Sequence, residues 1–205
     1  MSKVKICGLT KLADIHAVNE YLPDYAGFIL SQPFRRYVDI ANLAFLRKQL
    51  NHRIRAVGVF VNEAPEYIFE YLEQDLIDIV QLHGNEDNDF ILEIKREYPF
   101  FPLIRSFEIH DEKDIRSANL SLADLVLLDA GKGSGKTFDW NLLAGMKRPY
   151  ILAGGLNPDN ISEALAKCDP FAADTSSGVE TNGNKDPEKI KAFIAAVRKE
   201  QGVIL

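Results

Sequence analysis

The chain has 205 residues, of which 46% are hydrophobic and 26% charged, a balance typical of a globular protein with a sizeable core. Its net charge of -6 argues against nucleic acid as the main partner, because binding a polyanion needs a clustered excess of lysine and arginine. It does not exclude a small anionic ligand, which needs only a local group of hydrogen-bond donors.

No basic and then apolar segment opens the chain, and no apolar stretch is long enough to cross a bilayer. We therefore expect a cytoplasmic protein with no membrane partner. The two cysteines, Cys7 and Cys168, form no CxxC pair, and no two histidines have metal-ligand spacing. The sequence predicts neither a disulfide framework nor a metal site.

Eight short apolar runs recur along the chain, 21 to 30 residues apart at their ends. Runs of this kind are typical of parallel strands that are buried on both faces. They cover residues 4–7, 25–30, 54–60, 78–81, 101–106, 123–129, 150–153 and 171–174.

Helical patterns lie between these runs. They cover residues 11–22, with Thr10 as the expected N-cap, and then 42–50, 64–74, 85–98, 157–167 and 186–201. The segments after Ser106 and around "WNLLAGMK" look short or irregular. Eight strand–helix units of similar length, without a linker, predict one α/β domain over residues 1–205, a compact (β/α)8 TIM barrel. An open doubly wound sheet is the alternative, although it rarely needs eight such regular units.

Residues suited to catalysis or ligand binding lie where the predicted strands end, which is where the active sites of such barrels are found. The residues at or just after these ends are Cys7, Arg35, Arg36, Asn62, Gln81, His83, Asp129, Gly154, Gly155 and Asp174. This ring of polar groups predicts an active site on one rim of the barrel.

The loops after the seventh and eighth runs have the composition of a phosphate site. "LAGGLNPDN" contains Gly154 and Gly155, and "DTSSGVE" contains Ser177 and Gly178. Glycine lets backbone N–H groups approach an anion closely, serine adds a donor, and barrels often bind phosphate at this place. A single such turn would be only a tight turn, but two in neighbouring loops favour a phosphate ligand.

Cys7 and Asp129 end the first and sixth runs, which lie on opposite sides of a barrel. A thiol and a carboxylate placed in this way can flank a ligand as general base and general acid. Taken alone, Cys7 is more simply a buried inert thiol and Asp129 a loop cap. In "SQPFRRYV" we choose Arg36 to bind a ligand carboxylate and Arg35 as the surface residue. His83 in "VQLHG" is either structural or ligand-facing.

Six motifs resemble, in order and spacing, those of the phosphoribosylanthranilate isomerase family. They are "KICGLT", "VGVFVN", "VQLHGNE", "LLDAGKGSGKTFDW", "LAGGLNPDN" and "DTSSGVETNGNKD", and they extend over nearly the whole chain. The resemblance implies a TIM barrel of the ribulose-phosphate-binding type without a cofactor. It also implies an aldose–ketose isomerase of tryptophan biosynthesis, which converts N-(5-phosphoribosyl)anthranilate into 1-(2-carboxyphenylamino)-1-deoxyribulose 5-phosphate.

The resemblance also implies residue roles. Cys7 matches the general base of the family, Asp129 its general acid and Arg36 the arginine that holds the anthranilate carboxylate. The expected substrate-binding residues are Arg36, His83, Gly154, Gly155, Asp174, Ser177 and Gly178.

Two other functions are weaker alternatives. A lyase that closes an indole ring would need a catalytic lysine with glutamate partners at strand ends. A sugar-phosphate sensor would need neither Cys7 nor Asp129. We expect a small phosphorylated substrate as partner, and either a monomer or a homodimer.

Overall fold

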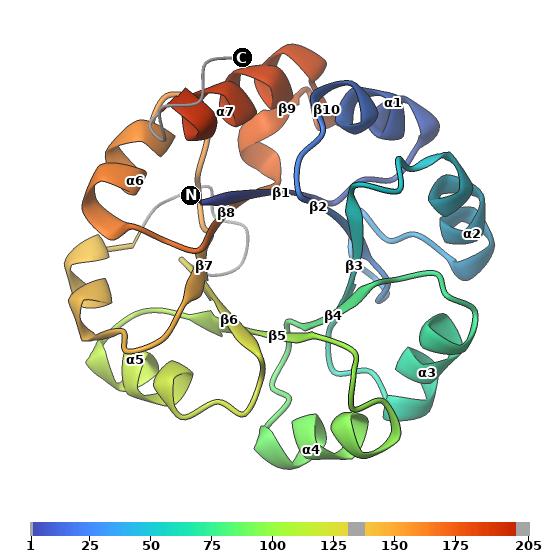
Figure 1. Ribbon diagram of the computed structural model, residues 1–205, viewed down its shortest axis with the longest axis horizontal. Helices are drawn as coiled ribbons and strands as arrows, with labels where there is room; N and C mark the ends of the chain where they lie inside the picture. The colour runs from blue at the N-terminus through green and yellow to red at the C-terminus, as the bar shows by residue number, and fades with distance from the viewer. Residues whose placement is uncertain (1, 131–137, 200–205) are drawn as a thin grey trace.

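Eight parallel strands form a closed barrel in the computed structural model, which describes residues 2–130 and 138–199 (Figure 1). The strands are β1 (Lys3–Cys7), β2 (Tyr25–Ile29), β3 (Arg55–Phe60), β4 (Ile79–Leu82), β5 (Leu103–Glu108), β6 (Leu125–Asp129), β7 (Tyr150–Leu152) and β8 (Ala172–Thr175). The first strand, β1, pairs with β2 on one side and with β8 on the other, so the sheet closes on itself. The predicted TIM barrel is confirmed.

The helices lie outside the ring of strands (Figure 1). They are α1 (Leu12–Tyr21), α2 (Ile40–Gln49), α3 (Pro65–Glu73), α4 (Asn88–Glu97), α5 (Glu112–Asn119), α6 (Ile161–Cys168) and α7 (Pro187–Lys199). The segment between β6 and β7 that was expected to be irregular contains a 3-10 helix, η1 (Trp140–Gly145). Within residues 2–130 and 138–199, no helix is both long and apolar enough to cross a membrane.

The predicted carboxyl ends of the strands agree with the structure to within one residue, except that β5 continues to Glu108 instead of ending at Ser106. Thr10 as N-cap of the first helix was wrong, because Lys11 takes that position. The reason is Asp14, whose Oδ2 accepts hydrogen bonds from the backbone N–H groups of Thr10 and Lys11 and holds them outside the helix. Residues 131–137 of the fourth motif, "LLDAGKGSGKTFDW", and residues 200 and 201 of the last predicted helix lie outside the described residues.

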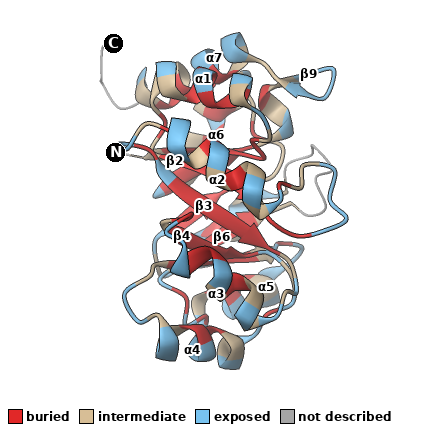
Figure 2. Cartoon of the chain, turned by 90° about the vertical axis from the view of Figure 1, so that its right-hand side faces the viewer, coloured by how far each residue is buried: buried red, intermediate tan, exposed pale blue. Residues whose placement is uncertain are grey.

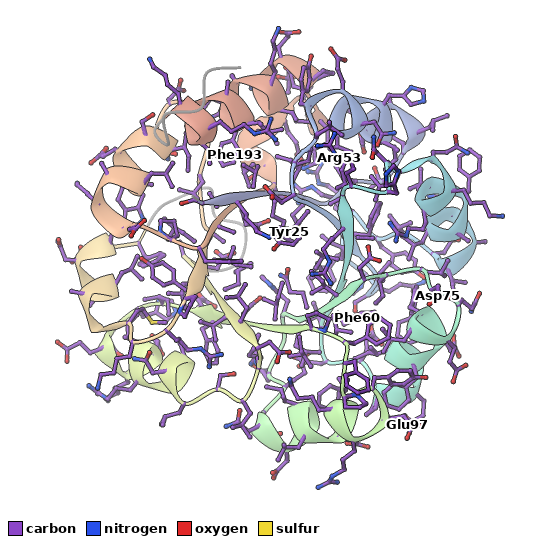
Figure 3. All side chains as sticks on the ribbon, viewed as in Figure 1. Tyr25, Arg53, Phe60, Asp75, Glu97 and Phe193 are labelled. Carbon is purple, nitrogen blue, oxygen red and sulfur yellow. The ribbon has the colours of Figure 1, made fainter. Side chains whose placement is uncertain are left out.

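Two apolar layers build the core. The inner layer fills the barrel with one side chain from most strands: Tyr25, Val57, Ile79, Ile104, Leu127, Ile151, Ala153 and Ala172. The outer layer lies between the strands and the helices, and it includes Phe60 and Phe193. Figure 3 labels Tyr25 inside the ring and Phe193 between α7 and the barrel. In Figure 2 the barrel strands β3, β4 and β6 are red, while the helices show pale blue outward faces.

Side chains alternate along each strand, so every second residue points into the barrel. Lys5 and Cys7 therefore share the inner face of β1, and Tyr25 and Gly27 are their paired neighbours on β2. The inner apolar layer fills the lower part of the barrel. Polar inward residues follow at the carboxyl ends of the strands, where the active site was expected.

After β8 the chain forms a short 3-10 helix, η2 (Ser177–Val179), and then an antiparallel hairpin of β9 (Glu180–Thr181) and β10 (Asn184–Lys185). The turn between β9 and β10 consists of Asn182 and Gly183, with φ of +50° and +76°. Asn-Gly with two positive φ angles is the preferred sequence of a two-residue hairpin turn. The hairpin was not predicted, although "NGN" carried its signal.

Candidate active site

Cys7 ends β1 and is buried at the mouth of the barrel. Its neighbour on β2 is Gly27, where a Cβ would lie 2.8 Å from Cys7 Sγ and 3.0 Å from Lys5 Nζ. The missing side chain of Gly27 therefore makes the space that the thiol and the ammonium group share.

Lys5 is fully buried, and its Nζ donates a hydrogen bond of 2.9 Å to Asp174 Oδ1 on β8. Burial alone would lower the pKa of Lys5, but the charges of Asp174 and Cys7 outweigh it, and the pKa is raised. The ammonium form of Lys5 is therefore favoured beside the thiol. The predicted residue Asp174 lies at the strand end as expected, and one of its oxygens is committed to Lys5.

His83 follows β4 and belongs to a small polar network. Its Nδ1 lies 3.1 Å from Gln81 Nε2 and 2.8 Å from Ser106 Oγ. With the Gln81 amide donating, Nδ1 is the acceptor and the proton of the neutral ring lies on Nε2. Burial lowers the pKa of His83, while the nearby carboxylate of Asp129 opposes the shift. The imidazole is thus neutral at physiological pH and in the electrostatic range of Asp129.

Asp129 ends β6, across the barrel from Cys7 on β1. Its side chain is partly exposed, and its backbone carbonyl accepts a hydrogen bond of 2.9 Å from Ile109 N–H. The strand order therefore brings the two predicted catalytic residues to one rim from opposite sides.

The loops after β7 and β8 are joined to each other. Thr175 Oγ1 donates a hydrogen bond of 2.6 Å to the carbonyl of Leu156. A Cβ on Gly178 would come within 2.0 Å of the same carbonyl oxygen, so only glycine allows the loops to approach in this way. Gly154 and Gly155 have φ of +85° and +66°, which is the left-handed region that favours glycine. The four predicted phosphate-site residues therefore line two adjoining loops.

Arg36 and Arg35 both contact Glu180 on β9, but in different ways. Arg36 donates to both carboxylate oxygens, from Nε to Oε1 at 2.7 Å and from Nη2 to Oε2 at 3.0 Å. Arg35 donates to Oε2 through Nη2 at 2.9 Å. The Arg36 side chain is 23% exposed and that of Arg35 is 59% exposed, so Arg36 is the more enclosed of the two.

Lys185 of β10 completes this cluster. Its buried Nζ donates to Glu180 Oε1 at 2.9 Å and to the carbonyl of Ser176 at 2.8 Å. Burial would raise the pKa of Glu180, but hydrogen bonds from Arg36, Lys185 and Arg35 outweigh it and lower the pKa to about 2. Glu180 is therefore a carboxylate at any physiological pH.

Three residues of the site were not predicted from the sequence: Lys5, Glu180 and Lys185. Lys5 had a signal, because it is a charged residue inside an apolar strand run. The signal for Glu180 and Lys185 was the Asn-Gly turn, which predicts that they lie side by side on two paired strands. Asn62, also on the predicted rim, is occupied in the loops, because its Oδ1 accepts a hydrogen bond from Asn85 N–H. Among the described residues, no three His, Cys, Asp or Glu side chains could hold a metal ion together.

A closed (β/α)8 barrel with a thiol, a carboxylate, an imidazole and an arginine on its carboxyl-end rim belongs to the class of TIM-barrel enzymes. The family model for N-(5'-phosphoribosyl)anthranilate (PRA) isomerase matches residues 4–196. The chain belongs to this family and is an isomerase of tryptophan biosynthesis.

Individual relatives agree with this assignment. N-(5'-phosphoribosyl)anthranilate isomerase from Endomicrobium trichonymphae is 42% identical over 203 residues, which are 97% of this chain and 99% of the relative. The crystal structure of phosphoribosyl anthranilate isomerase from Thermotoga maritima superimposes with a TM-score of 0.87 at 36% identity, covering 97% of this chain and 100% of that chain. A structure of phosphoribosyl anthranilate isomerase in complex with reduced 1-(o-carboxyphenylamino)-1-deoxyribulose 5-phosphate has a TM-score of 0.85 at 35% identity, with the same coverage.

Proposed function

We propose that this isomerase performs the Amadori rearrangement of N-(5-phosphoribosyl)anthranilate with Cys7 as general base and Asp129 as general acid. The observation that carries the proposal is the position of the two residues at the ends of β1 and β6, on opposite sides of one barrel mouth. Acid and base catalysis on one sugar needs two groups that reach it from different sides.

Asp129 acts first in this mechanism. Its carboxylic acid protonates the oxygen of the furanose ring, the bond from that oxygen to C1′ breaks, and the nitrogen lone pair forms a protonated Schiff base. Cys7 then removes the proton from C2′ as a thiolate, and the electron pair moves to give the enolamine. The enolamine tautomerises to the aminoketose. Each proton transfer by a placed side chain contributes on the order of 10²–10⁴-fold.

The remaining predicted residues bind the two ends of the substrate. The phosphate binds to backbone N–H groups and a hydroxyl of the loops after β7 and β8, at Gly154, Gly155, Ser177 and Gly178. A hydrogen bond from Thr175 joins these two loops. Arg36 receives the anthranilate carboxylate. His83 donates from Nε2 to a substrate oxygen, because its Nδ1 is occupied. The homologue in complex with a carboxyphenylamino deoxyribulose phosphate supports a ligand with these two anionic ends.

The test follows the fluorescence of phosphoribosylanthranilate, generated in place from anthranilate, after purified protein is added without metal or cofactor. We expect turnover by the wild type and a loss of about 10²–10⁴-fold in both Cys7→Ala and Asp129→Asn. Cys168→Ala is the matched control, because Cys168 lies at the end of α6, away from the rim. Near-normal turnover in Cys7→Ala would make Cys7 a core residue and overturn its role as the base.

A further inference from the structure

We propose that Glu180 is a positioning residue that aims Arg36 at the carboxylate of the substrate. This inference rests on the proposed function, because it takes Arg36 as the residue that binds the anthranilate carboxylate. Glu180 itself does not touch the substrate in this arrangement. It acts through the guanidinium group.

The contact between Glu180 and Arg36 fixes the plane of the guanidinium group. Both carboxylate oxygens of Glu180 accept from Arg36, at 2.7 Å and 3.0 Å, so the pair is bidentate. A bidentate contact sets the orientation of both planar groups, which a single hydrogen bond does not. The Glu180 side chain is only 7% exposed, so water competes little for these bonds.

The contact also decides which edge of the guanidinium group remains open. Arginine has five N–H donors, one on Nε and two on each Nη atom. Glu180 takes the Nε–H and one Nη2–H, along the side of the group. Among the described residues, no other acceptor binds the two Nη1–H groups or the second Nη2–H. One Nη1–H and this second Nη2–H lie parallel and form the end of the fork. This end has the geometry for a second bidentate carboxylate.

Glu180 does not cancel the positive charge of the cluster. Arg35, Arg36 and Lys185 all form ion pairs with this one carboxylate, which leaves a surplus of two positive charges. The surplus lies beside the loop after β8, because Lys185 also donates to the carbonyl of Ser176. A carboxylate that arrives at Arg36 therefore meets net attraction instead of repulsion by Glu180.

The hairpin of β9 and β10 holds Glu180 in place for this purpose. Lys189 Nζ donates to the backbone carbonyl of Glu180 at 2.8 Å, and Lys185 Nζ donates to its side chain at 2.9 Å. The backbone of Glu180 is thus held from α7 and its carboxylate from its own hairpin, and Arg36 reaches the carboxylate from the loop after β2. Such anchoring is what a positioning residue needs.

The experiment compares steady-state kinetics of the wild type, Glu180→Gln, Arg36→Ala and the double variant. Glutamine keeps the shape of Glu180 but loses the charge and one acceptor oxygen. We expect KM of Glu180→Gln to rise about tenfold, as loss of one charge-assisted contact implies, with kcat changed less than about threefold. In the Arg36→Ala background the same change should have little further effect on KM. Glu163→Gln, in an exposed pair with Lys167 on α6, is the matched control and should leave both constants unchanged.

A second readout separates positioning from a general structural role. It is the affinity for reduced 1-(o-carboxyphenylamino)-1-deoxyribulose 5-phosphate compared with the same compound without its ring carboxylate. The wild type should prefer the carboxylate compound, and Glu180→Gln should lose most of that preference. Equal weakening of both compounds, an unchanged KM, or a full additional effect in the Arg36→Ala background would each overturn the inference. Absence of turnover in the wild type would instead refute the proposed function.

Discussion

Gly8 directly follows Cys7 and has a backbone conformation that only glycine adopts easily. Its φ is +76°, and a Cβ at this position would lie 2.5 Å from Arg36 Cδ and 3.0 Å from Ser176 Oγ. Because Gly8 has no side chain, the aliphatic part of the Arg36 side chain can pass over the end of β1. Ser176 Oγ can also approach and donate a hydrogen bond of 3.0 Å to the carbonyl of Cys7. One glycine thus links the thiol, the arginine and the loop after β8.

Gly8→Ala tests this arrangement, and Gly145→Ala in η1 is its control. The φ of Gly8 is +76°, so Gly8→Ala should cost about 1–3 kcal/mol of unfolding free energy through backbone strain. At Gly145 the Cβ would meet Cγ2 of Ile115, which is not part of the site, at 3.0 Å. We therefore expect a large rise in KM for Gly8→Ala alone, measured with the fluorescence assay. Similar KM values in the two variants would show that Gly8 does not shape the Arg36 site.

The closure of the barrel between β1 and β8 contains a buried ion pair. Lys5 and Asp174 are opposite each other in the register of the two strands, and their side chains meet inside the barrel. A buried pair of this kind adds little net stability, but the removal of one partner leaves an unpaired buried charge. A change at Lys5 of β1 therefore requires a compensating change at Asp174 of β8.

Lys5→Met should lower the unfolding free energy by about 3–5 kcal/mol, because Asp174 then lacks its partner. The double variant Lys5→Met/Asp174→Asn should recover part of this loss, since no charge is left unpaired. Urea unfolding followed by circular dichroism measures both values. Lys167→Met removes an exposed ion pair and should change the free energy by less than about 1 kcal/mol. A double variant that is no more stable than Lys5→Met would contradict the coupling.

The stability of the complete barrel in acid depends on carboxylates whose pKa differs between the folded and the unfolded chain. The pKa of Glu180 falls from its ordinary 4.5 to about 2 on folding. A group with a lowered folded pKa stabilises the fold above its unfolded pKa, and this contribution disappears as the pH falls through the folded value. The window for Glu180 therefore extends from about pH 4.5 down to about pH 2.

Unfolding of the wild type and of Glu180→Gln over this pH range measures the contribution. The wild type should be the more stable protein above pH 4.5, and the difference between the two should shrink steadily toward pH 2. Glu163→Gln serves as the control, because its ion pair with Lys167 is exposed and contributes little to the free energy of unfolding. A Glu180→Gln difference that is constant over the range would mean that this carboxylate titrates normally in the folded protein.

Most of the barrel could be predicted because its strands carry their own local signal. Each is a short apolar run, and the spacing between runs matches one strand and one helix. The observed carboxyl ends agree to within one residue at seven of the eight strands, and that of β5 differs by two. Thr10 was assigned incorrectly because a side chain four residues away, Asp14, decides where the helix begins. The positions of the site residues could be predicted with the strands, since a strand end is also a place on the rim.

The partners of those site residues could not be predicted, because they come from distant parts of the chain. Arg36 meets Glu180 across 144 residues, and Lys5 meets Asp174 across 169. A sequence pattern reports local periodicity, and it contains no information on which of several charged side chains will face each other after the barrel closes. The amino-acid sequence was enough for the fold, the rim and the family. Only the closed barrel decides that Arg36 has one edge bound and one edge open, because ring closure brings the hairpin after β8 next to the loop after β2.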